Sequence, residues 1–119
     1  MTRFADPDAV RSYYEYVDDG AYDALVDLFA ETVTYERPGQ DPIEGIEEFE
    51  AFYREVRPLS NGSHEVESLV VDGDRVAVEG RFEGEQGDDR VEFGFADFHT
   101  FDADGDIAHR RTYTDRDEV

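Results

Sequence analysis

The hydrophobic period of this chain changes near residue 63, and that change limits the folds open to it. From there on, apolar and polar residues alternate, which is typical of half-buried strands. Four strands are predicted, over residues 65–71, 75–84, 90–101 and 107–114. Short turns rich in Asp and Gly join them, as in antiparallel hairpins. The second half therefore predicts an antiparallel sheet with one buried face.

The first half has helical spacing instead. Asp6 is a suitable N-cap, Pro7 suits the first turn, and an apolar stripe follows at spacings of three and four. We expect helices over residues 7–19, 22–29 and 44–56, and one strand over residues 32–37. Residues 60–62 read as a loop before the strands begin. This order predicts a single α+β domain, residues 1–119, with three helices on one face of a curved, mostly antiparallel sheet.

The chain is strongly acidic. It has 32 acidic residues against 11 basic ones, all of them arginine, and a net charge of -21. A surface this acidic repels itself in dilute buffer, whereas molar salt screens the repulsion. We therefore expect a protein adapted to a salt-rich, halophilic cytoplasm; the alternative is an ordinary acidic protein. The same field disfavours binding to nucleic acid and to anionic membranes.

Other features of composition exclude further classes of chemistry. The chain has no cysteine, which excludes disulfides and thiolate chemistry. No apolar run reaches membrane-spanning length, and the first residues lack the apolar stretch of a signal peptide, so we expect a cytoplasmic protein. No cluster of His, Asp and Glu has metal-ligand spacing, and we expect neither a metal nor a cofactor.

One carboxylate lies among phenylalanines in the stretch FGFADFHTF. In a regular strand, Asp97 shares its face with a mostly aromatic set: Phe93, Phe95, His99 and Phe101. A buried carboxylate needs a raised pKa or a hydrogen-bond partner. We expect Asp97 to be a pocket acid; the alternative places Ala96 and Phe98 inside and Asp97 in solvent.

Several strings of the sequence together resemble a known family. They are YYEYVDDGAYDALVDLFAETVTYERPG, PIEG, FYREV, DGDRVAVEGRFEG and ADFHTFDADGDIAHRRTY. They are similar to the SnoaL-like and ketosteroid-isomerase-like group of the nuclear-transport-factor-2-like superfamily, over nearly the whole chain. The resemblance implies a cone-shaped sheet wrapped around the helices and a pocket open at one end. It also implies a homodimer formed through the outer face of the sheet.

The resemblance implies site residues as well. Tyr13 matches a tyrosine that donates a hydrogen bond to a developing enolate oxygen, and Tyr53 matches a tyrosine that supports it. Asp97 matches a second donor, a carboxylic acid kept neutral by an apolar site. The base of the isomerases is an aspartate directly before a proline, and Arg37 occupies that place. Arg37 could clamp a substrate carboxylate or enolate, pair with Asp97, or form a salt bridge at the pocket rim.

Further residues are expected around the pocket. An aromatic wall is predicted from Phe29, Phe49, Phe82, Phe95 and Phe101. His99 is either a general acid or base, or a hydrogen-bonded wall residue. Arg110 and Arg111 are adjacent, so only one of them faces inward. In a regular strand Arg111 would share its face with Ile107 and Tyr113, which favours Arg111 as the inward residue. The family register favours Arg110 instead.

Three functions follow from these residues. The first is acid/base isomerisation, cyclisation or dehydration of a small, apolar, enolisable carbonyl compound; Tyr13 and Asp97 would stabilise the oxyanion and Arg37 would orient the substrate. Its base would be Glu36, Asp41 or His99. The second is a non-catalytic ligand-binding or dimerisation module, which the replaced base favours. The third is hydrolysis of a strained ring such as an epoxide.

Overall fold

The computed structural model describes residues 5–57 and 59–115. Its helical elements are α1 (Pro7–Asp19), α2 (Tyr22–Val26), α3 (Ile46–Ala51) and the π-helical turn η1 (Phe52–Val56). Its strands are β1 (Phe29–Glu36), β2 (Ile43–Glu44), β3 (Leu59–Asp72), β4 (Arg75–Gln86), β5 (Asp89–Phe101) and β6 (Ile107–Thr114). The predicted α+β class is confirmed.

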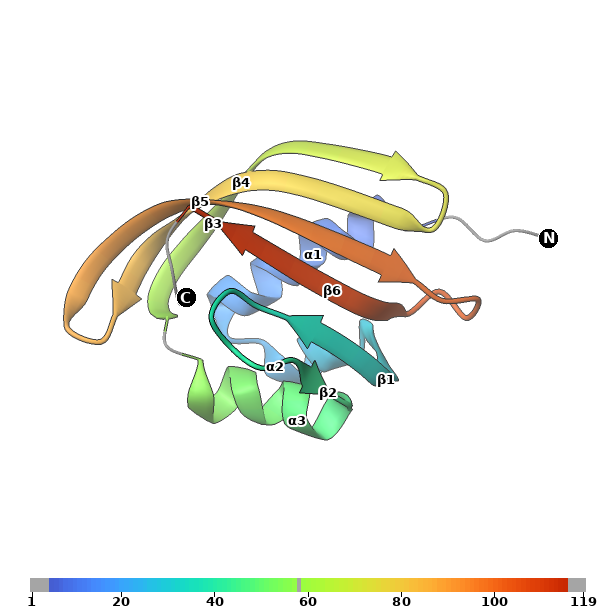
Figure 1. Ribbon diagram of the computed structural model, residues 1–119, viewed down its shortest axis with the longest axis horizontal. Helices are drawn as coiled ribbons and strands as arrows, with labels where there is room; N and C mark the ends of the chain where they lie inside the picture. Colours follow the sequence, from blue (N-terminus) through green and yellow to red (C-terminus); the bar gives the residue numbers. More distant parts are fainter. Residues whose placement is uncertain (1–4, 58, 116–119) are drawn as a thin grey trace.

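The six strands form one mixed sheet in the order β2-β1-β6-β5-β4-β3. β1 and β6 run parallel, and all other neighbouring pairs are antiparallel. The sheet is curved and unclosed, and the helices lie on one side of it (Figure 1). Its curvature brings β3, at one edge, back to the end of α1, where Asp18 hydrogen-bonds His64. The interior enclosed in this way is where polar side chains from distant strands can meet.

α1 begins and ends as its sequence predicts. The Asp6 carboxylate accepts hydrogen bonds from the backbone N–H groups of Asp8 (2.9 Å) and Ala9 (3.4 Å), as an N-cap does. Gly20 follows the helix in the left-handed conformation, φ 70°, which glycine adopts without strain. The buried face carries Val10, Tyr13, Tyr14 and Val17. The helix therefore directs two adjacent tyrosines into the interior.

Several boundaries in the first half differ from the prediction. α2 ends at Val26, and Phe29 opens β1 instead of closing the helix. The two-residue strand β2 was not predicted; it pairs with β1 and lies on the outer edge of the sheet. The predicted third helix is present but changes to π-helical geometry at Phe52. That change leaves the adjacent Phe52 and Tyr53 both buried.

β3 is longer than predicted. It begins at Leu59, so the expected loop over residues 60–62 is wrong. Asn61 has a positive φ of 47°, and the pairing with β4 is irregular between Ser60 and Ser63. The polar Ser-Asn-Gly segment therefore forms a bulge that bends the strand without ending it.

A bulge in β6 decides which of its adjacent arginines faces the interior. Thr100 pairs with His109 and Phe101 with Ile107, so one residue of β6 between them is extra. As a result Arg110 is buried on the same side as Ile107, and Arg111 is exposed. The alternation argument for Arg111 is wrong because it assumed a regular strand. The inward orientation of Arg110 is confirmed.

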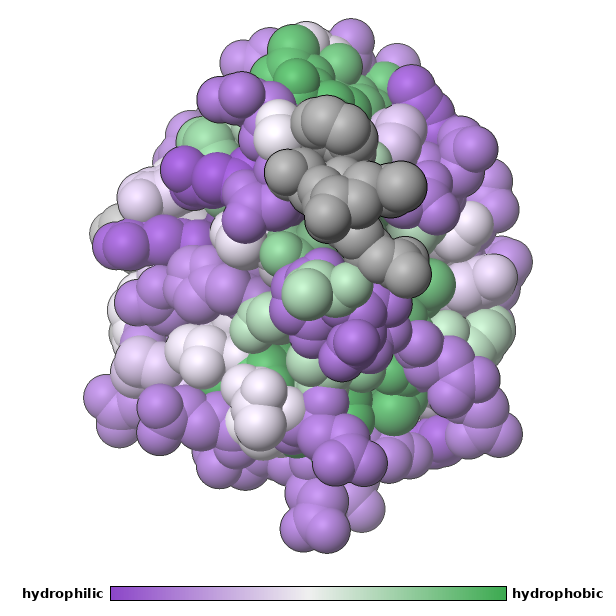
Figure 2. Space-filling model, turned by 90° about the vertical axis from the view of Figure 1, so that its right-hand side faces the viewer, coloured by the Kyte–Doolittle hydropathy of each residue, from purple (hydrophilic) through white to green (hydrophobic). Residues whose placement is uncertain are grey.

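The buried apolar side chains of helices and strands form one cluster. The face shown in Figure 2 is largely hydrophilic, with small and separate hydrophobic areas. Among residues 5–57 and 59–115, no helix combines the length and apolar character that crossing a bilayer requires.

Candidate active site

A small cavity inside the curved sheet gathers most of the buried polar groups. Its volume is ≈ 20 Å³, enough for about one water molecule. Its lining consists of Tyr13, Tyr35, Arg37, Arg57, Leu59, His64, Phe93, Phe95, Asp97, Arg110 and Thr112. Most of these side chains are polar or charged, in contrast to the predicted apolar wall.

Asp97 lies on the inner face of β5, as predicted. Its exposed fraction is 2%, and its neighbours of the same parity, Phe95 and His99, are buried with it. Ala96 and Phe98 are only partly buried. The alternative with Asp97 in solvent is therefore wrong.

The charge state of Asp97 differs from the prediction. Its carboxylate accepts hydrogen bonds from Arg110 (2.7 Å), Tyr14 (2.6 Å) and Thr112 (2.6 Å). Burial alone raises the pKa of Asp97, but the Arg110 guanidinium and the hydrogen bonds outweigh it and hold the pKa below its ordinary value. Asp97 is thus an ionised, fully paired carboxylate. The expectation of a neutral, proton-donating acid is wrong, and its partner is Arg110 rather than Arg37.

Tyr14 was missed in the sequence because only its neighbour matched the family pattern. The Tyr14 hydroxyl donates to Asp97, and its oxygen lies 3.3 Å from His99 Nε2. Since the Tyr14 proton is committed to Asp97, His99 donates its Nε2 proton to the Tyr14 oxygen. The apolar stripe on α1 contained the necessary signal, because Tyr13 and Tyr14 both belong to it.

Tyr13 and Tyr53 meet as the resemblance implied. Their hydroxyl groups hydrogen-bond each other. Burial raises the pKa of both phenols, so both are neutral. One bond between two hydroxyl groups uses one proton, which leaves a second O–H for a ligand. The Arg110 guanidinium lies over the Tyr13 ring at 4.3 Å.

A hydrogen-bond chain runs along one side of the cavity. Arg37 donates to the Tyr35 hydroxyl (2.6 Å), which lies 3.1 Å from Thr112 Oγ1. Thr112 gives its own proton to Asp97, so Tyr35 donates to Thr112. Burial raises the pKa of Tyr35, but Arg110 and Arg37 outweigh burial and lower the pKa below its ordinary value. Tyr35 is therefore an acidified phenol next to the cavity.

His99 lies behind the cavity lining. It has no exposed surface, and its Nδ1 is buried without a hydrogen-bond partner among the described residues. Burial, reinforced by Arg110, lowers the pKa of His99 to about 3. The imidazole is therefore neutral across the physiological range.

The predicted aromatic wall is mostly core. Of its five members, Phe95 lines the cavity. The others lie in the surrounding cluster, where Phe29 packs against Phe49 at 4.3 Å between ring centroids. Phe82 and Phe101 are buried in the same cluster. The cavity is thus narrower and more polar than the aromatic content of the chain suggested.

Arg57 and His64 are among the lining residues that received no role from the sequence, as are Tyr35 and Thr112. Arg57 follows η1, and its guanidinium lies over the Tyr53 and Phe82 rings. His64 lies on β3 and bonds Asp18. His64 was missed because the residue that fixes its ring, Asp18, lies 46 positions before it in the chain.

The family model described as the SnoaL-like domain matches residues 10–110. The chain belongs to the SnoaL-like family. Its fold is that of the ketosteroid-isomerase-like and nuclear-transport-factor-2-like proteins, as predicted.

Solved structures agree with this assignment. The epoxide hydrolase/cyclase-like enzyme SalBIII, described with a role in pyran ring formation in the polyether salinomycin, is 28% identical with a TM-score of 0.79; the match covers 91% of this chain and 88% of that one. An LEH-like epoxide hydrolase from M. tuberculosis is 22% identical (TM-score 0.79, 90% and 80% covered). A ketosteroid-isomerase-like protein from Catenulispora acidiphila, in complex with trimethylamine, is 18% identical (TM-score 0.79, 92% and 86% covered). Cyclase and epoxide-hydrolase types thus occur among structures similar to this SnoaL-like domain.

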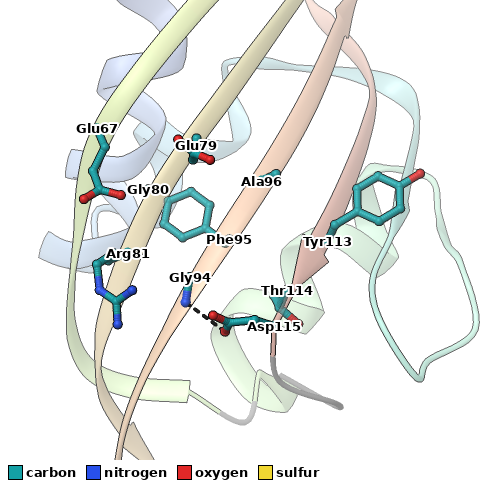
Figure 3. A pocket seen from close by; sticks show the side chains of 10 residues that line it. All are labelled: Glu67, Glu79, Gly80, Arg81, Gly94, Phe95, Ala96, Tyr113, Thr114 and Asp115. Atoms are coloured by element: carbon teal, nitrogen blue, oxygen red, sulfur yellow. Dashed lines mark hydrogen bonds between the residues drawn. The ribbon is translucent and has the colours of Figure 1, made fainter.

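The SnoaL-like domain also has a larger concavity, ≈ 400 Å³, on the outer face of the sheet (Figure 3). Glu67, Glu79, Arg81 and Asp115 extend around it, and Asp115 accepts a hydrogen bond from Gly94 N (2.9 Å). This surface is open, and the buried ion pair lies in the interior instead. We therefore place the candidate active site in the inner cavity. Homodimerisation through this outer face stays a prediction.

In the described part of the chain, no group of three or more His, Cys, Asp or Glu side chains is placed to hold a metal ion.

Proposed function

We propose that this SnoaL-like domain catalyses acid/base isomerisation or cyclisation of a small carbonyl compound, whose oxyanion forms beside Tyr35. The observation that carries the proposal is the hydrogen-bond chain from Arg37 through Tyr35 and Thr112 to Asp97 along the cavity. Preorganised donors directed at a developing negative charge are usually the largest single contribution to such catalysis.

Tyr35 takes the donor role first expected of Asp97. Two guanidinium groups lower its pKa, so its O–H is a better donor to an enolate oxygen than an ordinary phenol. When Tyr35 turns its proton to a ligand, the Thr112 oxygen still accepts from Arg110 (3.0 Å). When Tyr53 is the donor within the Tyr13–Tyr53 pair, Tyr13 has a second O–H for the cavity that it lines. Asp97 keeps Arg110 and Thr112 in place and takes no part in proton transfer.

Exchange of α-protons tests this proposal without the natural substrate. Acetone in D2O exchanges its methyl protons through an enolate, and proton NMR follows the rate. We expect the protein to accelerate exchange, and Tyr35→Phe to reduce the acceleration by about 10²-fold, the usual cost of losing an oxyanion donor. Tyr113→Phe, on the outer face, is the matched control. Equal acceleration by the wild type and Tyr35→Phe would contradict the role of Tyr35.

A second candidate is a ligand-binding module without catalysis. The cavity volume of ≈ 20 Å³ favours it, since a ligand larger than water requires side chains to move. This candidate predicts that small ketones exchange no faster with protein than in buffer alone. The acetone experiment therefore separates the two candidates directly.

A further inference from the structure

His64 and Asp18 form a hydrogen-bonded pair at the edge of the cavity. His64 Nδ1 lies 2.6 Å from Asp18 Oδ1, and the backbone N–H of His64 donates to Asp18 Oδ2 (2.8 Å). The His64 side chain is 9% exposed and lines the same cavity as Tyr35 and Asp97. Two contacts to one carboxylate fix both the strand and the ring at this point.

This pairing determines which ring nitrogen is free. The carboxylate of Asp18 can only accept, so Nδ1 carries the proton and Nε2 has the lone pair. Within residues 5–57 and 59–115, no side chain hydrogen-bonds Nε2. His64 Nε2 is therefore available to accept a proton. The other polar groups of the cavity are hydrogen-bond donors, apart from the Asp97 carboxylate, whose oxygens already accept hydrogen bonds.

Burial keeps His64 neutral, although four charged or titratable groups surround it. They are Tyr14 and Asp18 from α1, Arg57 after η1, and Asp97 from β5. Burial lowers the pKa of His64 most strongly; Asp18 acts against burial, and the net shift is downward. A neutral imidazole is the form that accepts a proton.

Arg57 is a cation beside His64. Its guanidinium lies 5.6 Å from the centre of the Phe82 ring, and the His64 ring lies 4.9 Å from the same ring. Its Nε is buried without a hydrogen bond, and no carboxylate of the described residues pairs with it. Acidic residues outnumber basic ones in this chain by 32 to 11. An arginine left without a carboxylate here is suited to the carboxylate of a ligand.

We propose that His64 is the proton acceptor of this site, positioned by Asp18, and that Arg57 binds the carboxylate of a small oxo acid as substrate. This inference rests on the proposed function and names its base and its substrate class. Nε2 takes a proton from the carbon next to the carbonyl group. The C–H electron pair becomes the C=C bond of the enolate, and the carbonyl π pair moves to the oxygen beside Tyr35. In a substrate with a second C=C conjugated to this enolate, the oxygen electron pair re-forms the carbonyl bond, the enolate C=C pair shifts to the next bond, and the far carbon takes the proton back from Nε2, which completes an isomerisation.

A purely structural role for the Asp18–His64 pair makes different predictions. In that case the pair only fastens α1 to β3, and the reaction does not depend on Nε2. His109 provides the matched control, because it forms a similar pair with Glu36 (2.8 Å) away from the cavity, with 39% of its side chain exposed.

The first experiment measures deuterium exchange into the methyl group of pyruvate, a small oxo acid. We expect wild type and His109→Gln to accelerate exchange alike, and His64→Gln to lose about 10²-fold, as for a general base. Nitrogen NMR checks the assignment on the folded protein: His64 should show a protonated Nδ1 and a bare Nε2, and Asp18→Asn should shift that tautomer balance. Full exchange activity in His64→Gln, or a protonated Nε2 in the wild type, would overturn the assignment.

The second experiment compares pyruvate with acetone, which has the same methyl ketone without the carboxylate. We expect wild type to bind pyruvate and to favour it in exchange, and Arg57→Gln to lose this preference. Arg54→Gln, in an exposed ion pair with Glu50, should retain it. Acceleration of acetone without preference for pyruvate would overturn the inference and leave the proposed function standing. Acceleration of neither probe would overturn both.

Discussion

At the scale of single residues, the interior carries charge where a core normally carries none. The Arg110 guanidinium is stacked between the rings of Tyr13 and Tyr35, at 4.3 Å and 4.5 Å. Its ion pair with Asp97 has side-chain exposed fractions of only 3% and 2%. Breaking such a pair leaves an uncompensated buried charge, which typically costs about 3–5 kcal/mol. The ion pair therefore supports the site by holding the side chains of Arg110 and Asp97 in place.

His99, next to this pair, makes stability depend on pH. Its pKa is about 3 in the folded protein against an ordinary 6.5, so the unfolded chain takes up the proton first as the pH falls. Its contribution is complete above pH 6.5 and is lost as the pH falls toward 3. Within that window, we expect His99→Gln to reduce the slope of unfolding free energy by up to about 1.4 kcal/mol per pH unit. Urea unfolding at several pH values measures the slope.

The control for this prediction is His109→Gln. His109 is partly exposed, with 39% of its side chain accessible, so this variant shows the effect of the same substitution outside the core. If His99→Gln and wild type have the same slope between pH 4 and 6, His99 is not held neutral by burial.

The place of Asp97 could be predicted from the sequence, whereas its charge could not. Strand alternation alone puts Asp97 inside. Its protonation state depends on Arg110, Tyr14 and Thr112, which reach it from another strand and a helix. His64 was missed for a similar reason, since its partner Asp18 is 46 positions away in the chain. Partners at long sequence separation leave no local signal.

At the scale of elements, close contact between β3, β4 and β5 requires glycine. A Cβ at Gly80 would lie 2.2 Å from the Glu65 carbonyl oxygen and 2.8 Å from the Phe95 ring. The backbone of the neighbouring strand cannot move aside as a flexible side chain can. A Cβ at residue 80 would therefore push the strands apart. We expect Gly80→Ala to lower the free energy of unfolding by about 1–3 kcal/mol, as overpacking does.

Gly94 on β5 is the matched control for Gly80. A Cβ there would meet the end of the Asp115 side chain at 3.2 Å, which can turn away. We expect Gly94→Ala to change stability by about 0.5 kcal/mol or less. Denaturant unfolding of both variants gives the comparison, and equal stabilities for them would show that the strands adjust freely.

Helices and strands could be predicted where the spacing of apolar residues stays regular. α1 and the cores of β4 and β5 follow directly from capping and alternation. The errors lie at irregular points, namely the bulge after Ser60, the bulge in β6 and the start of β1 at Phe29. A bulge shifts strand parity by one position, which is why alternation selected Arg111 instead of Arg110.

At the scale of the whole molecule, acidic repulsion opposes folding in dilute buffer. The net charge is -21, and the exposed ion pairs of the described residues involve few of the 32 carboxylates. We expect the urea midpoint to rise from about 0.1 M to about 1 M KCl, where the screening length falls from ~10 Å to ~3 Å. An uncharged osmolyte at equal osmolality is the control. Equal midpoints at both salt concentrations would contradict adaptation to salt.

The central claim is that the buried carboxylate of Asp97 is charged, so that proton transfer belongs to other groups around the cavity. Carbon NMR of labelled aspartate carboxyl groups, with Asp97→Asn used to assign the signal, tests it directly. The account predicts that the Asp97 signal keeps its ionised position as the pH is lowered to about 4, near the ordinary aspartate pKa. A signal that titrates above that value, or is already protonated at neutral pH, would contradict the account and restore Asp97 as the proton donor.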